Sequence, residues 1–268
     1  STNVDYYLVL ILSTLSIAGI YSPAVLIGTV LLMILTSLEQ TLLPFFSHLY
    51  GKTDIESLKN KSTVVSRYLF FIYLPLCFAA FASCPVIITG IFGERYTESI
   101  YPSMIIILGI TLTSVGTVFN NVLKTIGRTR IFFASTLCAL SVQLFISVFT
   151  IPVIGAIGAA MARSSAYAIM LIVPAYRLKQ IAGLPYDRKA LEMGLIGSIV
   201  VAFAVFTVNS ILINPYCLSV SLPVGFMSYL VTLRLTHAMN SKDFEIINNI
   251  LSGKIKWPLM VITKIVLH

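Results

Sequence analysis

Long apolar stretches, each bounded by charged or turn-forming residues, dominate the hydropathy pattern of this chain. Because the hydrocarbon core of a bilayer is about 30 Å thick, a helix needs about 20 mostly apolar residues to cross it. The stretches that approach or reach this length are residues 4–20, 23–46, 67–92, 102–124, 131–151, 155–176, 190–213 and 218–235. The pattern therefore predicts an all-α integral membrane protein with about eight transmembrane helices.

Composition agrees with this prediction. Hydrophobic residues make up 57% of the 268 residues, charged residues make up 10%, and the mean hydropathy is +0.95. Soluble domains are roughly half apolar and one quarter charged. A water-soluble fold has no means of burying so much apolar surface, and the class of soluble catalytic domains is excluded.

The basic residues alternate between the two sides of the predicted membrane. Sixteen of the 18 Lys and Arg lie on one side, the opposite loops contain only Arg95, beside Glu94 and Glu98, and Arg163 lies inside a predicted helix. Basic residues in short loops mark the cytoplasmic side. We therefore predict a multi-pass protein of the cell membrane with a cytoplasmic C-terminus. The net charge of +8 then reflects topology, and no nucleic-acid partner is expected because no basic stripe is interleaved with aromatic residues.

Sequence motifs of catalysis are absent from the chain. The four cysteines have no C-x-x-C spacing, the three histidines are dispersed, and neither a nucleophile elbow, a P-loop nor an H-E-x-x-H motif occurs. We expect no enzyme activity, no catalytic residue, no metal and no cofactor.

Asp5 and Glu39 are the carboxylates that fall within the apolar segments, since Glu192 stands at a helix start. Arg163 is a basic residue inside a predicted helix. Such groups are costly at membrane depth and are functional candidates by default. Arg163 is about 12 Å from the outer end of its predicted helix, at about 1.5 Å per residue. It is expected either to form an ion pair with Asp5 or Glu39, or to bind an anionic ligand such as a phosphate.

Polar side chains on two other segments leave similar alternatives open. Glu39 lies near a line of hydroxyl and amide residues on the second segment, which forms either the wall of a wet cavity or a helix-packing surface, with Glu39 reaching toward the cytoplasmic interface. Thr117 and Asn120 lie on one face of the fourth segment. They are candidates to bind sugar hydroxyls, although such groups also hold helices together.

Several short stretches together resemble the C-terminal half of polysaccharide flippases in the multidrug/oligosaccharidyl-lipid/polysaccharide exporter superfamily. The resemblance covers about residues 5–176 and depends on the order and spacing of residues at predicted helix ends. These residues are Asp5, Gly19, Tyr21, Ala24, Pro44, Ser47, Gly51, Pro75, Phe92, Gly93, Tyr96, Gly127, Arg128, Pro152, Gly155, Gly158, Ala159 and Ala160.

The resemblance implies a domain organisation. Residues 1–176 would form the C-terminal six-helix bundle of a two-bundle exporter, with the first helix truncated, and residues 177–240 would add two further transmembrane helices. Residues 241–268 are expected to form a cytoplasmic interfacial helix and tail. The N-terminal half of the same transporter, about six helices, would precede Ser1 and act as a partner.

The resemblance also implies a function. The expected activity is movement of a lipid-linked oligosaccharide, a polysaccharide repeat unit on a polyprenyl or dolichyl phosphate, from the cytoplasmic to the outer leaflet by alternating access. Arg163, Asn120 and Thr117 would contact this substrate, and Asp5 or Glu39 would be a counter-charge or an ion-coupling site. The alternatives are an ion-coupled exporter of small molecules or drugs from the same superfamily, and a membrane-embedded glycosyl or acyl transferase.

Overall fold

The computed structural model describes residues 4–50, 55–181, 186–211 and 217–235, which are helical almost throughout and contain no strand. The all-α class is therefore confirmed for this part of the chain. The elements follow in the order α1 (Val4–Leu12), α2 (Leu15–Tyr50), α3 (Ile55–Ile87), the π-helical turn η1 (Ile88–Phe92), the 3-10 turn η2 (Glu94–Ser99), α4 (Ile100–Thr125), α5 (Thr129–Ile181), α6 (Arg188–Ile211) and α7 (Cys217–Leu235). The predicted interfacial helix and tail at 241–268 lie outside the described residues.

Among the described residues, six helices are long and apolar enough to cross a membrane, namely α2, α3 with η1, η2 with α4, α5, α6 and α7. A helix satisfies its own backbone hydrogen bonds, which is what a hydrocarbon environment requires. The arrangement is compatible with a multi-pass membrane protein. It does not confirm the predicted count of about eight crossings.

The first predicted crossing, residues 4–20, is interrupted. Helix α1 has 9 residues and ends at Leu12, too short to span a bilayer. The hydroxyl of Ser13 donates to the Val9 carbonyl at 2.6 Å, and the Thr14 hydroxyl accepts from the Ile17 amide at 3.4 Å, as an N-cap does for a new helix. The predicted boundary between the segments 4–20 and 23–46 is thus wrong, because the chain breaks earlier and α2 continues through residues 21 and 22.

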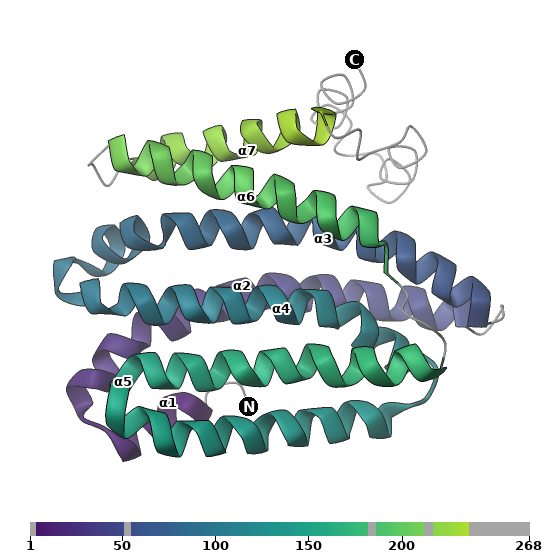
Figure 1. The fold of residues 1–268 in the computed structure, drawn as a ribbon, viewed down its shortest axis with the longest axis horizontal. Helices are drawn as coiled ribbons and strands as arrows, with labels where there is room; N and C mark the ends of the chain where they lie inside the picture. The colour runs from purple at the N-terminus through teal and green to yellow at the C-terminus, as the bar shows by residue number, and fades with distance from the viewer. Residues whose placement is uncertain (1–3, 51–54, 182–185, 212–216, 236–268) are drawn as a thin grey trace.

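Helix α5 contains 53 residues and turns back on itself at Gly155. There φ is 55° and ψ is −126°, a conformation that only glycine adopts readily. The two arms pack tightly just beyond the turn, where the Thr150 hydroxyl donates to the Gly158 carbonyl at 3.1 Å. The arms run side by side in Figure 1 and correspond to the fifth and sixth predicted segments.

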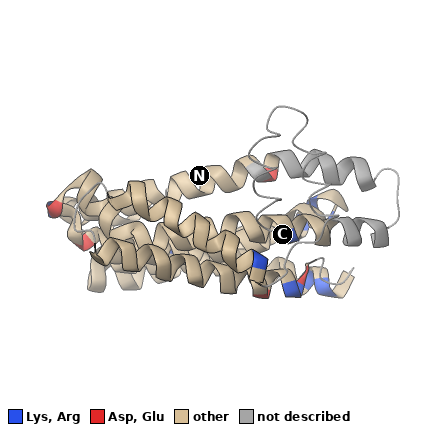
Figure 2. Cartoon of the chain, turned by 90° about the horizontal axis from the view of Figure 1, so that it is seen from above, with Lys and Arg blue, Asp and Glu red and all other residues tan. Residues whose placement is uncertain are grey.

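Successive long helices run in opposite directions (Figure 1). The end of one helix and the start of the next therefore lie at the same end of the molecule. Figure 2 shows the Lys and Arg residues gathered toward one end. Among the described basic residues, only Arg95 lies at the opposite end, in η2, and Arg163 lies between the two ends within α5. The predicted segregation of charge therefore corresponds to a segregation in space.

The main apolar core lies between α2, α3 and α4. Tyr73 of α3 is completely buried in it and donates its hydroxyl hydrogen to the Leu31 carbonyl of α2 at 2.7 Å. Helices α6 and α7 pack together and against α3 on the far side of this core (Figure 1), with the Tyr229 hydroxyl donating to the Phe71 carbonyl at 2.6 Å. The α6–α7 pair thus forms an outer layer on α3, on the opposite side of the core from α1 and α5.

Candidate binding site around Arg163

Asp5 and Arg163 form a buried ion pair between α1 and the second arm of α5. Arg163 Nη1 donates to Asp5 Oδ2 at 3.0 Å, and the side chains are 3% and 0% exposed, respectively. The hydroxyl of Tyr21, from α2, donates to the same carboxylate oxygen. Arg163 Nε donates to the hydroxyl of Tyr167 at 2.9 Å. One cluster therefore joins three helices.

Helical geometry brings these groups together. Tyr167 is one turn beyond Arg163 on the same face of α5, where i and i+4 side chains meet. The break at Ser13 lets the short helix α1 lie beside α5 and present Asp5 to it (Figure 1). Two polar atoms of the pair remain unsatisfied, however, since Asp5 Oδ1 and Arg163 Nη2 are buried and have no hydrogen-bond partner among the described residues.

A cavity of about 300 Å³ adjoins the ion pair. Its walls come from the start of α1 and from both arms of α5. The polar part of the lining consists of Thr136, Gln143, Arg163 and Tyr167, and the remainder is apolar. A guanidinium, a phenol and an amide beside one cavity provide hydrogen-bond donors for an oxygen-rich ligand.

Glu39 has a different partner. Its Oε1 accepts from Lys124 Nζ of α4 at 2.8 Å, and both side chains are about one quarter exposed. Lys124 Nζ also lies 4.4 Å from the ring centroid of Phe132. Of the two partners considered for Arg163, the structure selects Asp5, while Glu39 ties α2 to α4 toward the basic end.

Thr117 and Asn120 are buried in α4. Thr117 donates to the Thr113 carbonyl of its own helix at 3.1 Å, and Asn120 Nδ2 donates to the Met170 carbonyl of α5 at 3.4 Å. Neither lines the cavity beside Arg163. Their geometry favours the helix-packing alternative over contact with a sugar.

Sequence reasoning missed Tyr167, Gln143 and Thr136 as neighbours of Arg163. Tyr167 had a usable signal, because it follows Arg163 at i+4 on a predicted helix. Gln143 had one as well, since an amide within an apolar segment needs a polar partner. No local signal placed Thr136 there, because its position depends on the turn at Gly155.

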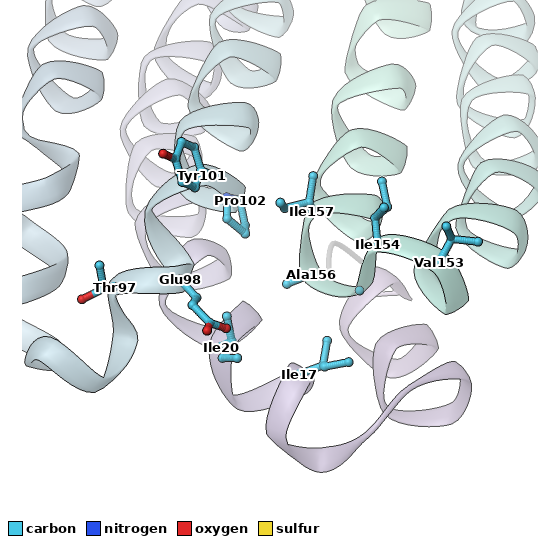
Figure 3. Close-up of a pocket in the computed structure, with 11 residues that line it drawn as sticks. Ile17, Ile20, Thr97, Glu98, Tyr101, Pro102, Val153, Ile154, Ala156 and Ile157 are labelled. Carbon is cyan, nitrogen blue, oxygen red and sulfur yellow. The ribbon is translucent and has the colours of Figure 1, made fainter.

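A larger hollow of about 540 Å³ lies at the end of the molecule away from most basic residues. Figure 3 shows Ile17 and Ile20 of α2, Tyr101 of α4 and Ile157 of α5 around it. Glu98 is the one charged residue among the described residues of its lining. Walls of this kind suit apolar chains better than polar ligands, and the hollow was not anticipated from the sequence.

Asp187 lies outside the apolar spans, and its surroundings shift the pKa of its carboxyl. Burial raises the pKa of its carboxyl, but hydrogen bonds from the Ala190 amide and from Arg67 outweigh burial and lower the pKa overall. Arg67 Nη2 lies 2.7 Å from Asp187 Oδ2. This pair fastens the start of α6 to α3 and has a structural role.

Comparison of the chain with protein-family models and with curated proteins finds no match.

Proposed function

We propose that this chain is part of a membrane transporter that moves a lipid-linked oligosaccharide, carried on a polyprenyl or dolichyl phosphate, from the cytoplasmic to the outer leaflet. The observation that carries the proposal is Arg163, a buried cation far from either end of α5. It lines a cavity, and its Nη2 has no partner in the part of the chain that the structure describes. A guanidinium in an apolar setting suits the phosphate of such a lipid.

Helix arrangement supports the same proposal. Six apolar helices with basic residues gathered at one end fit a polytopic protein whose basic end faces the cytoplasm, with the C-terminus on that side. The resemblance to the C-terminal half of polysaccharide flippases adds the expectation of a second, N-terminal bundle as partner. Alternating access would then occur between the two bundles.

The drug-exporter alternative has less support. Such a transporter needs acidic side chains open to a cationic ligand, whereas Asp5 is paired with Arg163 and Glu39 with Lys124. Of the two unsatisfied atoms of the Asp5–Arg163 pair, Asp5 Oδ1 and Arg163 Nη2, only the donor belongs to a residue that lines the cavity. An oxyanion is thus the better fit.

A reconstitution experiment tests the proposal. The protein encoded by the complete reading frame is placed in liposomes that contain a fluorescent lipid-linked oligosaccharide, and dithionite is added to bleach the outer leaflet. We expect bleaching to exceed the one-leaflet fraction within minutes, because inner-leaflet lipid reaches the outside. Bleaching equal to that of protein-free liposomes, together with export of a fluorescent organic cation, would favour the drug exporter instead.

A further inference from the structure

Arg163 still has hydrogen-bond donors to offer after its described contacts are counted. Nη1 donates to Asp5 and Nε donates to Tyr167, whereas Nη2 is buried without a partner among the residues that the structure describes. Arginine has five N–H donors in a planar fork that matches the oxygens of a phosphate. Arg163 lines the adjoining cavity, so an oxyanion that enters it would reach this unused donor once the guanidinium turns toward the cavity.

That counter-ion creates a problem of charge balance. Among the described residues, the titratable groups facing Asp5 are Tyr21 from α2 and Arg163 and Tyr167 from α5. Tyrosines are neutral near pH 7, so Asp5 and Arg163 together carry no net charge. A phosphate beside Arg163 would leave the buried cluster with an uncompensated negative charge, which is strongly unfavourable in an apolar interior.

One proton on Asp5 removes the imbalance. Asp5 Oδ2 accepts from Tyr21 and Arg163, while Oδ1 is buried and has no partner within the described ranges, which begin at Val4. Oδ1 is thus the oxygen that can carry a proton without displacing an existing hydrogen bond. The neutral acid would also stay in place, because the Tyr21 hydroxyl can still donate to Oδ2.

We propose that Asp5 and the phosphate of the ligand exchange as counter-ions of Arg163, and that Asp5 takes up one proton from water when the phosphate binds. The inference rests on the proposed contact between Arg163 and the lipid phosphate. Arg163 keeps its own proton throughout, and the proton returns to water when the phosphate leaves. Binding then strengthens as the pH falls, by about tenfold per pH unit for one linked proton.

Calorimetry of the full chain in phosphatidylcholine nanodiscs tests this exchange. The probe is dodecyl methyl phosphate, a phosphodiester whose single charge does not titrate near neutrality, and dodecanol is the uncharged control. Titrations at pH 6.5, 7.5 and 8.5 in two buffers of different ionisation enthalpy count the protons bound. We expect about one proton per probe molecule in the wild type and a Kd that rises about tenfold per pH unit.

Two variants separate the roles of the pair. Asp5→Asn should bind the probe at least tenfold more tightly at pH 8.5, with no proton uptake and no pH dependence. In the double variant Asp5→Asn/Arg163→Gln, both side chains of the pair are uncharged. This variant should not bind the probe, because it lacks the guanidinium. Should Asp5→Asn fail to fold, the wild-type proton count decides the question alone.

Several outcomes overturn the proposal. Probe binding by the wild type without proton uptake, equal binding by the double variant, or no binding by the wild type would each do so. Failure here is distinguishable from failure of the transport function. A protein that accelerates flipping but binds no proton refutes only the counter-ion exchange, whereas proton-linked binding without flipping refutes transport.

Discussion

In an apolar interior, the energy of a buried ion depends on its partner. Asp5 and Arg163 are both almost completely buried, and the charge of each is compensated chiefly by the other. Removing one partner of a buried pair commonly costs about 3–5 kcal/mol, whereas replacing both by neutral groups costs much less. This difference makes the pair testable without knowledge of the ligand.

We predict that Arg163→Gln and Asp5→Asn each lower stability by about 3–5 kcal/mol, and that the double variant is more stable than either single variant. Thermal unfolding of the purified chain in mild detergent measures the three effects. Arg188→Gln is the control, because the Arg188–Glu192 pair is exposed and should contribute little. Additive losses in the double variant would show that the two residues do not interact.

For single residues, the sequence predicted which charged side chains lie at membrane depth but not which residues they contact. The apolar context of Asp5, Glu39 and Arg163 marked all three as unusual. Which carboxylate meets Arg163 depends on which helices are neighbours, and hydropathy contains no information on that. Thr117 and Asn120 were ambiguous for the same reason, since a buried amide can face either a cavity or another helix.

Among the elements, α4 and the second arm of α5 approach closely at small residues. A Cβ added to Gly109 would lie 2.8 Å from the Ser164 Cα, which is backbone and cannot move aside alone. A Cβ on Gly19 of α2 would meet nothing within 4 Å. The two glycines therefore form a matched pair for testing this contact.

We predict that Gly109→Ala destabilises the chain by about 1–3 kcal/mol through overpacking, although alanine is the better helix former. Gly19→Ala should be neutral or stabilising by up to about 1 kcal/mol. Thermal unfolding in detergent compares them. If Gly109→Ala unfolds at or above the wild-type temperature, α4 and α5 are not in close contact there.

The residue that caps the N-terminus of α6 is Asp187, whose carboxyl group can titrate. Asp187 Oδ1 accepts from the Ala190 amide at 3.1 Å, and Oδ2 pairs with Arg67. Because folding lowers the pKa of Asp187, its charge stabilises the fold above the unfolded pKa of about 3.9, and this stabilisation is lost as the pH falls through the folded pKa.

We predict that Asp187→Asn, which keeps a capping side chain, costs about 1 kcal/mol or less near pH 6, and that the cost disappears at acid pH, below the folded pKa. Asp187→Ala should cost about 1 kcal/mol more at both pH values, because the cap is lost as well. Unfolding followed by circular dichroism at the two pH values gives both numbers. A cost of Asp187→Asn that grows toward acid pH would reverse the assigned sign.

Element boundaries were predictable where charge or glycine marks them. The ends of α4, α6 and α7 lie within a few residues of the predicted ends. The break before α2 was misplaced, because only the hydroxyls of Ser13 and Thr14 mark it, and hydroxyls also occur inside membrane helices. Capping geometry, which hydropathy does not contain, determines that boundary.

For the whole molecule, the gathering of basic residues at one end predicts an orientation. Single cysteines at Thr97, in η2, and at Thr129, at the start of α5, probe the two ends in a variant whose four native cysteines are replaced by alanine. A membrane-impermeant maleimide should label Thr97→Cys in intact cells and Thr129→Cys only after permeabilisation. The opposite pattern would invert the proposed topology.

The measurement that tests the account most directly is the rate of lipid-linked oligosaccharide flipping in proteoliposomes that contain the protein of the complete reading frame. The variant Asp5→Asn/Arg163→Gln keeps the interior neutral while removing the guanidinium, and Arg188→Gln alters only an exposed pair. We predict wild-type rates for Arg188→Gln and the rate of protein-free liposomes for the double variant. A double variant that flips the lipid as fast as the wild type would contradict the role of Arg163.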